Sequence, residues 1–179
     1  GMKFALLKNT EGKYFSLDEY KTAVEPTQTD KDKKVVLLYA TDVQKQYPYI
    51  DGAKAKGYDV LLMDCELDSH FINLLEQKME NVRFARVDSD SVGNLIPTEE
   101  KKAPELSDEE KKSIEELFKS ALPAENDYFV DPRSLGEDAE PVLITQNEFM
   151  RRYREMSALG GGMNFYGELP DSYTIIVNM

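Results

Sequence analysis

The chain has 179 residues, which suits one large domain or two small ones, and its formal net charge is −12. The acidic excess lies in residues 88–140, which hold 16 acidic and 6 basic residues. Binding to a phosphate backbone needs a surplus of Lys and Arg, so the composition argues against a nucleic-acid partner. No apolar run approaches the roughly 20 residues of a membrane helix and no signal peptide opens the chain, so we expect no membrane partner.

Cysteine usage and the first residues bear on where the chain comes from. Cys65 is the single cysteine, which excludes an internal disulfide and predicts a reducing, cytoplasmic location. Gly1 before Met2 is typical of a cloning remnant. We therefore expect an excised piece of a longer protein.

The first half of the chain contains three candidate strands. Residues 35–40 (VVLLYA) and 59–63 (DVLLM) are short and apolar on both faces, which is typical of buried strands in a parallel sheet. Residues 82–87 (VRFARV) alternate more, which predicts an edge or half-covered strand.

Helices are predicted before and between these strands. A capping box, Ser16 with Glu19, predicts a helix over 17–24. Asp42 is a predicted cap of a helix that holds Pro48 in its first turn or at a kink and stops at Gly57. Asp68 is the predicted N-cap of the next helix, whose apolar positions recur at helical spacing. These are Phe71, Ile72, Leu74 and Leu75. Alternating strands and helices predict an α/β fold, a three-layer α/β/α unit with a short parallel sheet and right-handed crossovers.

The second half predicts a linker and then a partial α+β unit. Residues 88–105 hold Gly93, Pro97 and Pro104, which indicates the linker. A capping box at Ser107 opens an amphipathic helix. Its apolar positions are Ile114, Leu117, Phe118 and Leu122. Short strands at 128–130, 142–145 and 173–177 and a helix at 147–159 complete the unit. We therefore divide the chain into domains 1–100 and 105–179.

Three aspartates offer an enzymatic interpretation. Asp42, Asp64 and Asp88 each follow a predicted parallel strand, at the sheet edge where open α/β sheets bind ligands. Together they could hold Mg²⁺ for a phosphotransfer or phosphatase-like reaction. The alternative is that they cap helices and turns, and no Gly-x-Gly-x-x-Gly or Walker lysine is present.

Cys65 and His70 are a second candidate for chemistry, as a nucleophile and its base. No third orienting group accompanies them, and one Cys with one His is too few for a zinc site. His70, near a helix start beside Phe71, is also interpreted as a surface aromatic.

The helix at 147–159 carries an apolar stripe opposite three arginines, Arg151, Arg152 and Arg154. The stripe consists of Phe149, Met150, Tyr153 and Met156. A stripe of this kind usually packs into a core. Met and aromatic side chains are also typical of adaptable binding surfaces, and Gly160–Gly162 and another apolar group follow. That group is Met163, Phe165 and Tyr166. Burial and exposure for binding both stay open.

Several segments in register resemble the ninety-kilodalton heat-shock chaperones in their bacterial form, high-temperature protein G. They are YFSLDEY, KDKKVVLLYATD, AKAKGYDVLLMDCELDSHFINLLEQK, NVRFARVDSD and PVLITQNEFMRRYREMSALGGG. The resemblance covers nearly the whole chain from Tyr14 onward. It implies the end of that family's middle domain up to about residue 100 and the start of its carboxyl-terminal domain from about residue 105.

The resemblance also implies what the chain binds. In the family, ATP and Mg belong to an amino-terminal domain without a counterpart here, and the full-length proteins form homodimers through helices that would lie beyond Met179. We therefore expect no cofactor, no metal and no ATP hydrolysis in this chain, and weak dimerisation. Family members hold unfolded or partly folded clients at two places. One matches His70 and Phe71, where relatives often carry a tryptophan, and the other matches Phe149, Met150, Tyr153 and Met156.

These observations favour a part of an ATP-dependent chaperone that contributes client contacts and interdomain coupling to protein folding, and not an enzyme by itself. The alternative is a small Mg-dependent phosphotransfer or phosphatase-like enzyme that uses Asp42, Asp64 and Asp88.

Overall fold

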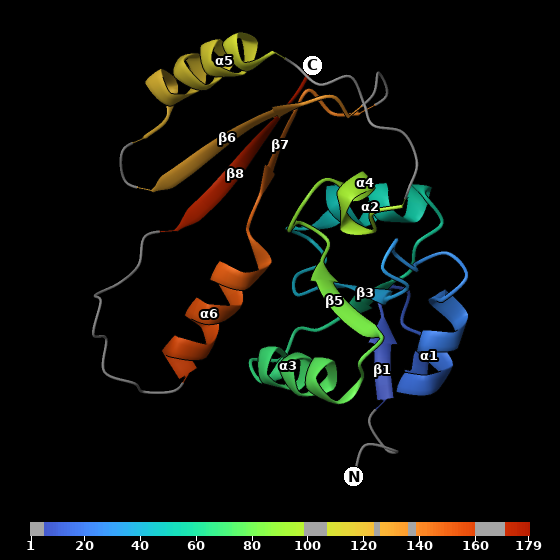
Figure 1. Cartoon of the computed structure of the whole chain (residues 1–179). Helices are drawn as coiled ribbons and strands as arrows, with labels where there is room; N and C mark the ends of the chain where they lie inside the picture. Colours follow the sequence, from blue (N-terminus) through green and yellow to red (C-terminus); the bar gives the residue numbers. More distant parts are fainter. Residues whose placement is uncertain (1–5, 99–106, 124–125, 136–138, 160–170) are drawn as a thin grey trace. The chain divides into compact units, whose positions relative to one another are not determined.

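The computed structural model describes residues 6–98, 107–123, 126–135, 139–159 and 171–179 (Figure 1). The chain divides into two compact units, one of Gly1–Asp88 with Val92–Glu99 and one of Ser89–Ser91 with Glu100–Met179. No helix among the described residues is both long enough and apolar enough to span a bilayer.

The first unit alternates strands and helices. In chain order they are β1 Leu6–Asn9, β2 Tyr14–Ser16, α1 Leu17–Val24, β3 Val35–Ala40, α2 Tyr47–Ala55, β4 Val60–Leu62, α3 Asp68–Lys78, β5 Val82–Arg86 and α4 Val92–Leu95. The sheet order is β2-β1-β4-β3-β5. The predicted parallel strands β3, β4 and β5 are confirmed, with β5 at an edge. β1 and β2 add an antiparallel hairpin that the sequence analysis did not predict, so the sheet is mixed.

Strand β3 shows why its sequence is apolar throughout. Val35, Leu37 and Tyr39 pack in one core with residues of α1 and α3. Their neighbours in β3 pack in a second core with α2 and α4. Successive side chains of a strand point to opposite faces, so a strand covered on both sides must be apolar at every position. Figure 1 shows α2 and α4 on one side of the sheet and α1 and α3 on the other, which confirms the three-layer α/β/α unit.

The helix boundaries confirm some predicted caps and correct others. The capping box of Ser16 and Glu19 starts α1 as predicted. Gly57 ends α2 with φ +79°, a conformation that favours glycine, and its N–H donates to the Lys54 carbonyl. Asp42 does not cap α2, which begins at Tyr47 with a proline in its first turn. Two backbone N–H groups of the preceding turn donate to the Asp42 carboxylate instead.

The predicted linker starts too early. Residues 92–95 form the short helix α4, and Leu95 and Ile96 are only 2% and 1% exposed because they pack in the core beneath it. The glycine and proline of this stretch interrupt regular structure without preventing burial. Residues 99–105 of the predicted linker, including Pro104, lie outside the described residues.

The second unit is a three-stranded sheet with helices. Its elements are α5 Asp108–Ala121, β6 Asp127–Arg133, β7 Val142–Thr145, α6 Glu148–Leu159 and β8 Ser172–Asn178. β8 lies in the middle, parallel to β6 and antiparallel to β7. The capping box of Ser107 and Glu110 starts α5 as predicted. The predicted α+β character of this unit is therefore confirmed.

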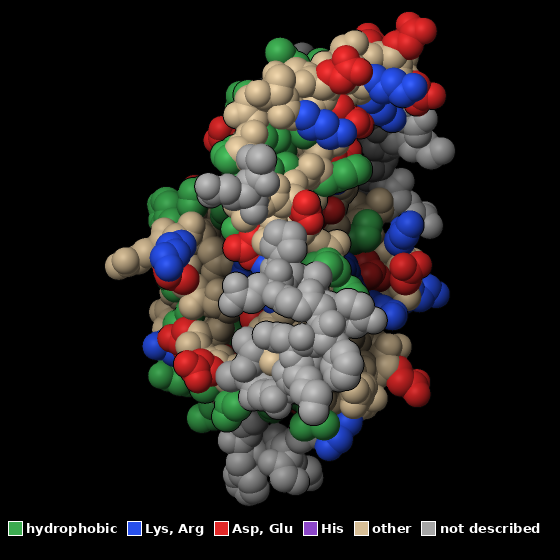
Figure 2. Space-filling model, turned by 90° about the vertical axis from the view of Figure 1, so that its left-hand side faces the viewer, with side chains coloured by type: hydrophobic (Ala, Val, Ile, Leu, Met, Phe, Trp, Pro, Cys, Tyr) green, Lys and Arg blue, Asp and Glu red, His purple; other side chains and the backbone are tan. Residues whose placement is uncertain are grey.

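Helix α5 packs against the sheet of this unit. Val130, Ile175 and Val177 form a small core, against which Ile114, Phe118 and Leu122 pack. Leu117 was expected on the same apolar face, but it is 68% exposed because it lies at the margin of that face. In Figure 2 acidic and basic side chains lie together on the outer surface of α5, at the top of the view.

Candidate functional site

The apolar stripe of α6 is exposed. Phe149 is 74% exposed, Tyr153 52%, Met150 38% and Met156 37%. The sequence left burial and exposure open, and the structure places all four side chains in contact with solvent. The three glycines and the apolar residues Met163, Phe165 and Tyr166 that follow lie outside the described residues.

The opposite side of α6 is charged and buried. Arg151 and Arg152 are only 4% and 8% exposed. Glu148 Oε1 accepts hydrogen bonds from Arg151 Nη2 at 2.8 Å and from Arg152 Nε at 2.6 Å. Glu155 forms a second ion pair with Arg151. Acids and bases at spacings of three and four share one face of a helix, so the four side chains neutralise each other there.

The helix is thus inverted relative to an ordinary surface helix, which buries its apolar face and exposes its charges. Burying a charge is tolerated only where it is paired and hydrogen-bonded, and the two glutamates meet that requirement. The helical spacing in the sequence places the arginines opposite the stripe but does not predict their burial. The glutamates at spacings of three and four were the signal that could have shown it.

A second apolar patch lies at the start of α3, on the first unit. We call Leu67, His70, Phe71 and Leu74 the α3 patch. Leu67 is 65% and Leu74 42% exposed, His70 is exposed, and Phe71 is partly buried against the core. The four residues recur at i, i+3, i+4 and i+7, so they share one face of the helix.

Only two members of the α3 patch, His70 and Phe71, were predicted from the sequence. Leu74 was predicted as one of four apolar positions at helical spacing, and the buried core contacts of this helix come from Ile72 and Leu75. Leu67 was not singled out, although counting back from Leu74 by the helical period would have found it. The N-cap prediction is wrong by one residue, because Leu67 is the cap and Asp68 begins the helix.

Three carboxylates lie at the amino-terminal end of the α3 patch. Asp64 and Glu66 are exposed, and Asp68 accepts a hydrogen bond from the Cys65 N–H. Burial raises the pKa of the Asp68 carboxyl, the Cys65 hydrogen bond opposes this shift, and the nearby charge of Asp64 adds to it. Together the three carboxylates make this end of the patch acidic.

The three aspartates of the enzymatic interpretation do not form a metal site. Across the described ranges, no group of three or more His, Cys, Asp and Glu side chains could hold a metal ion. Asp42 binds backbone N–H groups of its own turn, and Asp88 is paired with Arg86 at 2.9 Å. Asp42 and Asp88 thus serve local structure, and Asp64 is exposed. This finding counts against the Mg-dependent enzyme.

Cys65 and His70 are both exposed side chains at the start of α3. The charged residues next to Cys65 in the sequence are acidic, Asp64, Glu66 and Asp68, whereas an electropositive environment activates a nucleophilic cysteine. The arrangement favours the interpretation of His70 as a surface aromatic.

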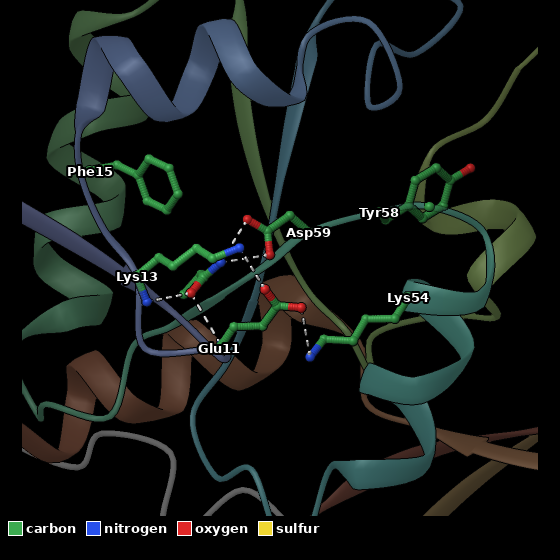
Figure 3. Close-up of a pocket in the computed structure, with 8 residues that line it drawn as sticks. Glu11, Lys13, Phe15, Lys54, Tyr58 and Asp59 are labelled. Carbon is green, nitrogen blue, oxygen red and sulfur yellow. Dashed lines mark hydrogen bonds and ion pairs between the residues drawn. The ribbon is translucent and has the colours of Figure 1, made fainter.

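The first unit also has a cavity of about 330 Å³ beside the β1–β2 turn (Figure 3). The Glu11 carboxylate lies between Lys13 and Lys54, with ion pairs of 3.1 and 3.8 Å. The hydrogen bond from Lys13, and then its charge, lower the pKa of Glu11. The buried Asn9 amide donates to both oxygens of Asp59 at 3.1 Å. These groups pair with one another, so the network fastens the turn to α2 and β4.

No family model matches the chain. The chain is 51% identical over 178 residues to a protein of Porphyromonas gingivalis described as chaperone protein HtpG. It is 47% and 45% identical, over the same length, to HtpG chaperones of Bacteroides fragilis and Bacteroides thetaiotaomicron. Each match covers 98% of this chain, which spans 26% of the length of these curated relatives.

Proposed function

The chain belongs to the HtpG family, the bacterial ninety-kilodalton heat-shock chaperones, and we propose that it contributes contacts to unfolded or partly folded client proteins. The contacts are the α6 stripe, Phe149, Met150, Tyr153 and Met156, together with the α3 patch. In the full-length protein, an ATP-driven cycle and dimerisation would depend on regions of the relatives outside the 26% of their length that this chain matches.

The observation that carries the proposal is the inverted orientation of α6. Four large apolar side chains face solvent while two arginines of the same helix are buried. Exposed apolar side chains that are clustered, and not scattered singly, are typical of surfaces that bind another protein. The burial of Arg151 and Arg152 with their glutamate partners keeps the stripe on the outside.

The chemistry of the stripe suits clients of many sequences. Burying apolar surface contributes roughly 25 cal/mol per Å² and has no directional requirement. Met side chains are flexible and polarisable, and aromatic rings offer large contact areas, so both adapt to irregular partners. A client therefore needs apolar residues and no particular motif.

The proposal assigns the two units a mechanical role as well. Client contacts lie on α3 in one unit and on α6 in the other, so a client held at both places would couple the two units. This coupling is the role that we propose for the chain within the whole chaperone, in place of catalytic chemistry.

The test replaces stripe residues and measures stability and binding separately. Met150→Ser and Tyr153→Ser are expected to change the free energy of unfolding by less than about 0.5 kcal/mol, as surface substitutions do. Both are expected to weaken binding of a permanently unfolded model protein. Leu117→Ser on α5 is the control, because Leu117 is an apolar residue of the same unit that lies outside both patches and is more exposed, at 68%, than Met150 or Tyr153.

Two outcomes would contradict the proposal. Steep loss of stability in both stripe variants, on the order of the 2–5 kcal/mol of core truncations, would mean that the stripe is core. Unchanged client binding in folded variants would mean that the stripe is exposed but does not hold clients.

A further inference from the structure

We propose that the α3 patch selects apolar client segments that are flanked by Lys or Arg, because its amino-terminal end carries Asp64, Glu66 and Asp68. The inference rests on the proposed function and adds to it the chemical class of segment that this patch prefers.

The size of the patch limits what it can cover. Leu67 and Leu74 are seven residues apart, which is about 10 Å along a helix. An extended chain rises roughly 3.3 Å per residue, so the apolar part of a client segment in contact has about three or four residues. Client residues next to that short apolar part must lie over the ends of the patch. There the charge of the surface strengthens or weakens their binding.

The charge at one end is acidic and not compensated locally. Between Lys56 and Lys78 the sequence has no Lys or Arg. Among the described residues, no ion pair engages Asp64, Glu66 or Asp68. Asp64 and Glu66 are exposed, so a Lys or Arg of a client can approach them without displacing an existing partner. Complementary charges around an apolar contact raise the association rate and favour one partner over another.

The α6 stripe provides a contrast within the same chain. Its neighbouring arginines already have acidic partners, Glu148 and Glu155 for Arg151 and Asp171 for Arg154. No comparable excess of one charge borders that stripe on the described part of α6. Charge selection is therefore a property of the α3 patch, and the α6 stripe is expected to accept segments by apolar content alone.

The experiment uses the whole 179-residue chain and two labelled peptides with the same short apolar centre, one flanked by Lys and the other by Glu. Fluorescence anisotropy at low salt is expected to show about tenfold tighter binding of the Lys-flanked peptide. The preference is expected to disappear in the double variant Asp64→Asn/Glu66→Gln and in 1 M salt, where charges are screened beyond about 3 Å. Asp68 is kept, because it accepts the Cys65 N–H.

Two further variants separate the patch from the general negative charge of the chain. Leu67→Ser/Leu74→Ser is expected to weaken the binding of both peptides several-fold, because it removes the apolar contact. Glu109→Gln/Glu116→Gln removes two exposed acids from α5 and is expected to leave the preference unchanged.

Equal binding of the two peptides would overturn the inference, and so would a preference that survives Asp64→Asn/Glu66→Gln or is lost equally in Glu109→Gln/Glu116→Gln. If the unfolded model protein still binds and Met150→Ser weakens it, only the charge selection fails. If neither the peptides nor the unfolded protein binds, the proposed function itself fails.

Discussion

Arg152 donates its Nε–H to Glu148 Oε1 at 2.6 Å, and the same oxygen accepts from Arg151. One carboxylate, 22% exposed, thus holds two guanidinium groups of which almost nothing reaches solvent. The pairing explains how α6 can turn its charged side inward and its apolar stripe outward. It also identifies the residue on which that orientation depends.

Glu148→Gln is therefore expected to destabilise the second unit. The change keeps the size of the side chain but removes the carboxylate charge that both buried arginines contact, while Arg151 keeps its ion pair with Glu155. Removing one partner of a fully buried ion pair lowers the free energy of unfolding by about 3–5 kcal/mol, whereas an exposed ion pair contributes about 1 kcal/mol or less. For Glu148→Gln we expect a loss between these limits. Denaturant unfolding measures it. Glu155→Gln is the control, with a smaller loss expected at its more exposed carboxylate, and equal losses would contradict the role of Glu148.

Neighbouring positions of α3 are expected to respond in opposite ways to truncation. Ile72 is 1% exposed and lies in the core, so Ile72→Ala should cost about 2–5 kcal/mol by leaving a cavity. Leu74→Ala should cost much less than Ile72→Ala, because Leu74 is 42% exposed and lies outside the core. Thermal and denaturant unfolding compare the two variants. A large loss on truncation of Leu74 would contradict its place in the α3 patch.

Tyr20 is expected to be a site where removing a polar group stabilises the fold. Its side chain is fully buried, and no described residue gives its hydroxyl a hydrogen-bond partner. A buried polar group without a partner costs about 1–3 kcal/mol, so Tyr20→Phe should raise the stability of the first unit by about 1 kcal/mol. Calorimetric melting at neutral pH is the measurement, and destabilisation would show that the hydroxyl is satisfied.

The same residue predicts a dependence on alkaline pH. Burial, and then the charge of Asp59, raise the pKa of Tyr20 well above its usual range. As the pH rises through the ordinary tyrosine pKa near 10, the unfolded chain loses this proton while the folded chain keeps it, so ionisation favours unfolding. The stability of the chain should fall above about pH 10, and it should fall less in Tyr20→Phe.

The capping box of α5 gives a prediction for the second unit. The Ser107 hydroxyl accepts the Glu110 N–H, so Ser107→Ala should destabilise by about 1 kcal/mol. Ser113→Ala is the control, since this hydroxyl bonds within the helix and alanine favours helix. Hydrogen bonds from Ser107 lower the pKa of Glu110. The stability that these bonds contribute is therefore fully present above the ordinary glutamate pKa and is lost as the pH falls below it. An acid titration that affects both variants alike would argue against the capping box.

Local patterns in the sequence were enough for most of the secondary structure and for the layers of the first unit. The continuous run Val35–Ala40 requires apolar cover on both faces of a strand, and the structure supplies it with helices on either side. Both capping boxes start helices at the predicted residues because their hydrogen bonds join groups only three residues apart. The segments shared with the HtpG chaperones likewise depend on the order of residues alone.

The orientation of the amphipathic helices was decided only by the tertiary structure. Periodicity states which residues share a face of α6, but not whether that face meets a core or solvent, because the answer lies in elements distant in sequence. Leu74 and Leu117 were predicted among the apolar positions of amphipathic helices, Leu67 was not singled out, and all three are exposed. The burial of Arg151 and Arg152 depends on their pairing with Glu148 and Glu155 once α6 has formed. The sequence thus determined the stripe, and three-dimensional packing determined that it faces outward.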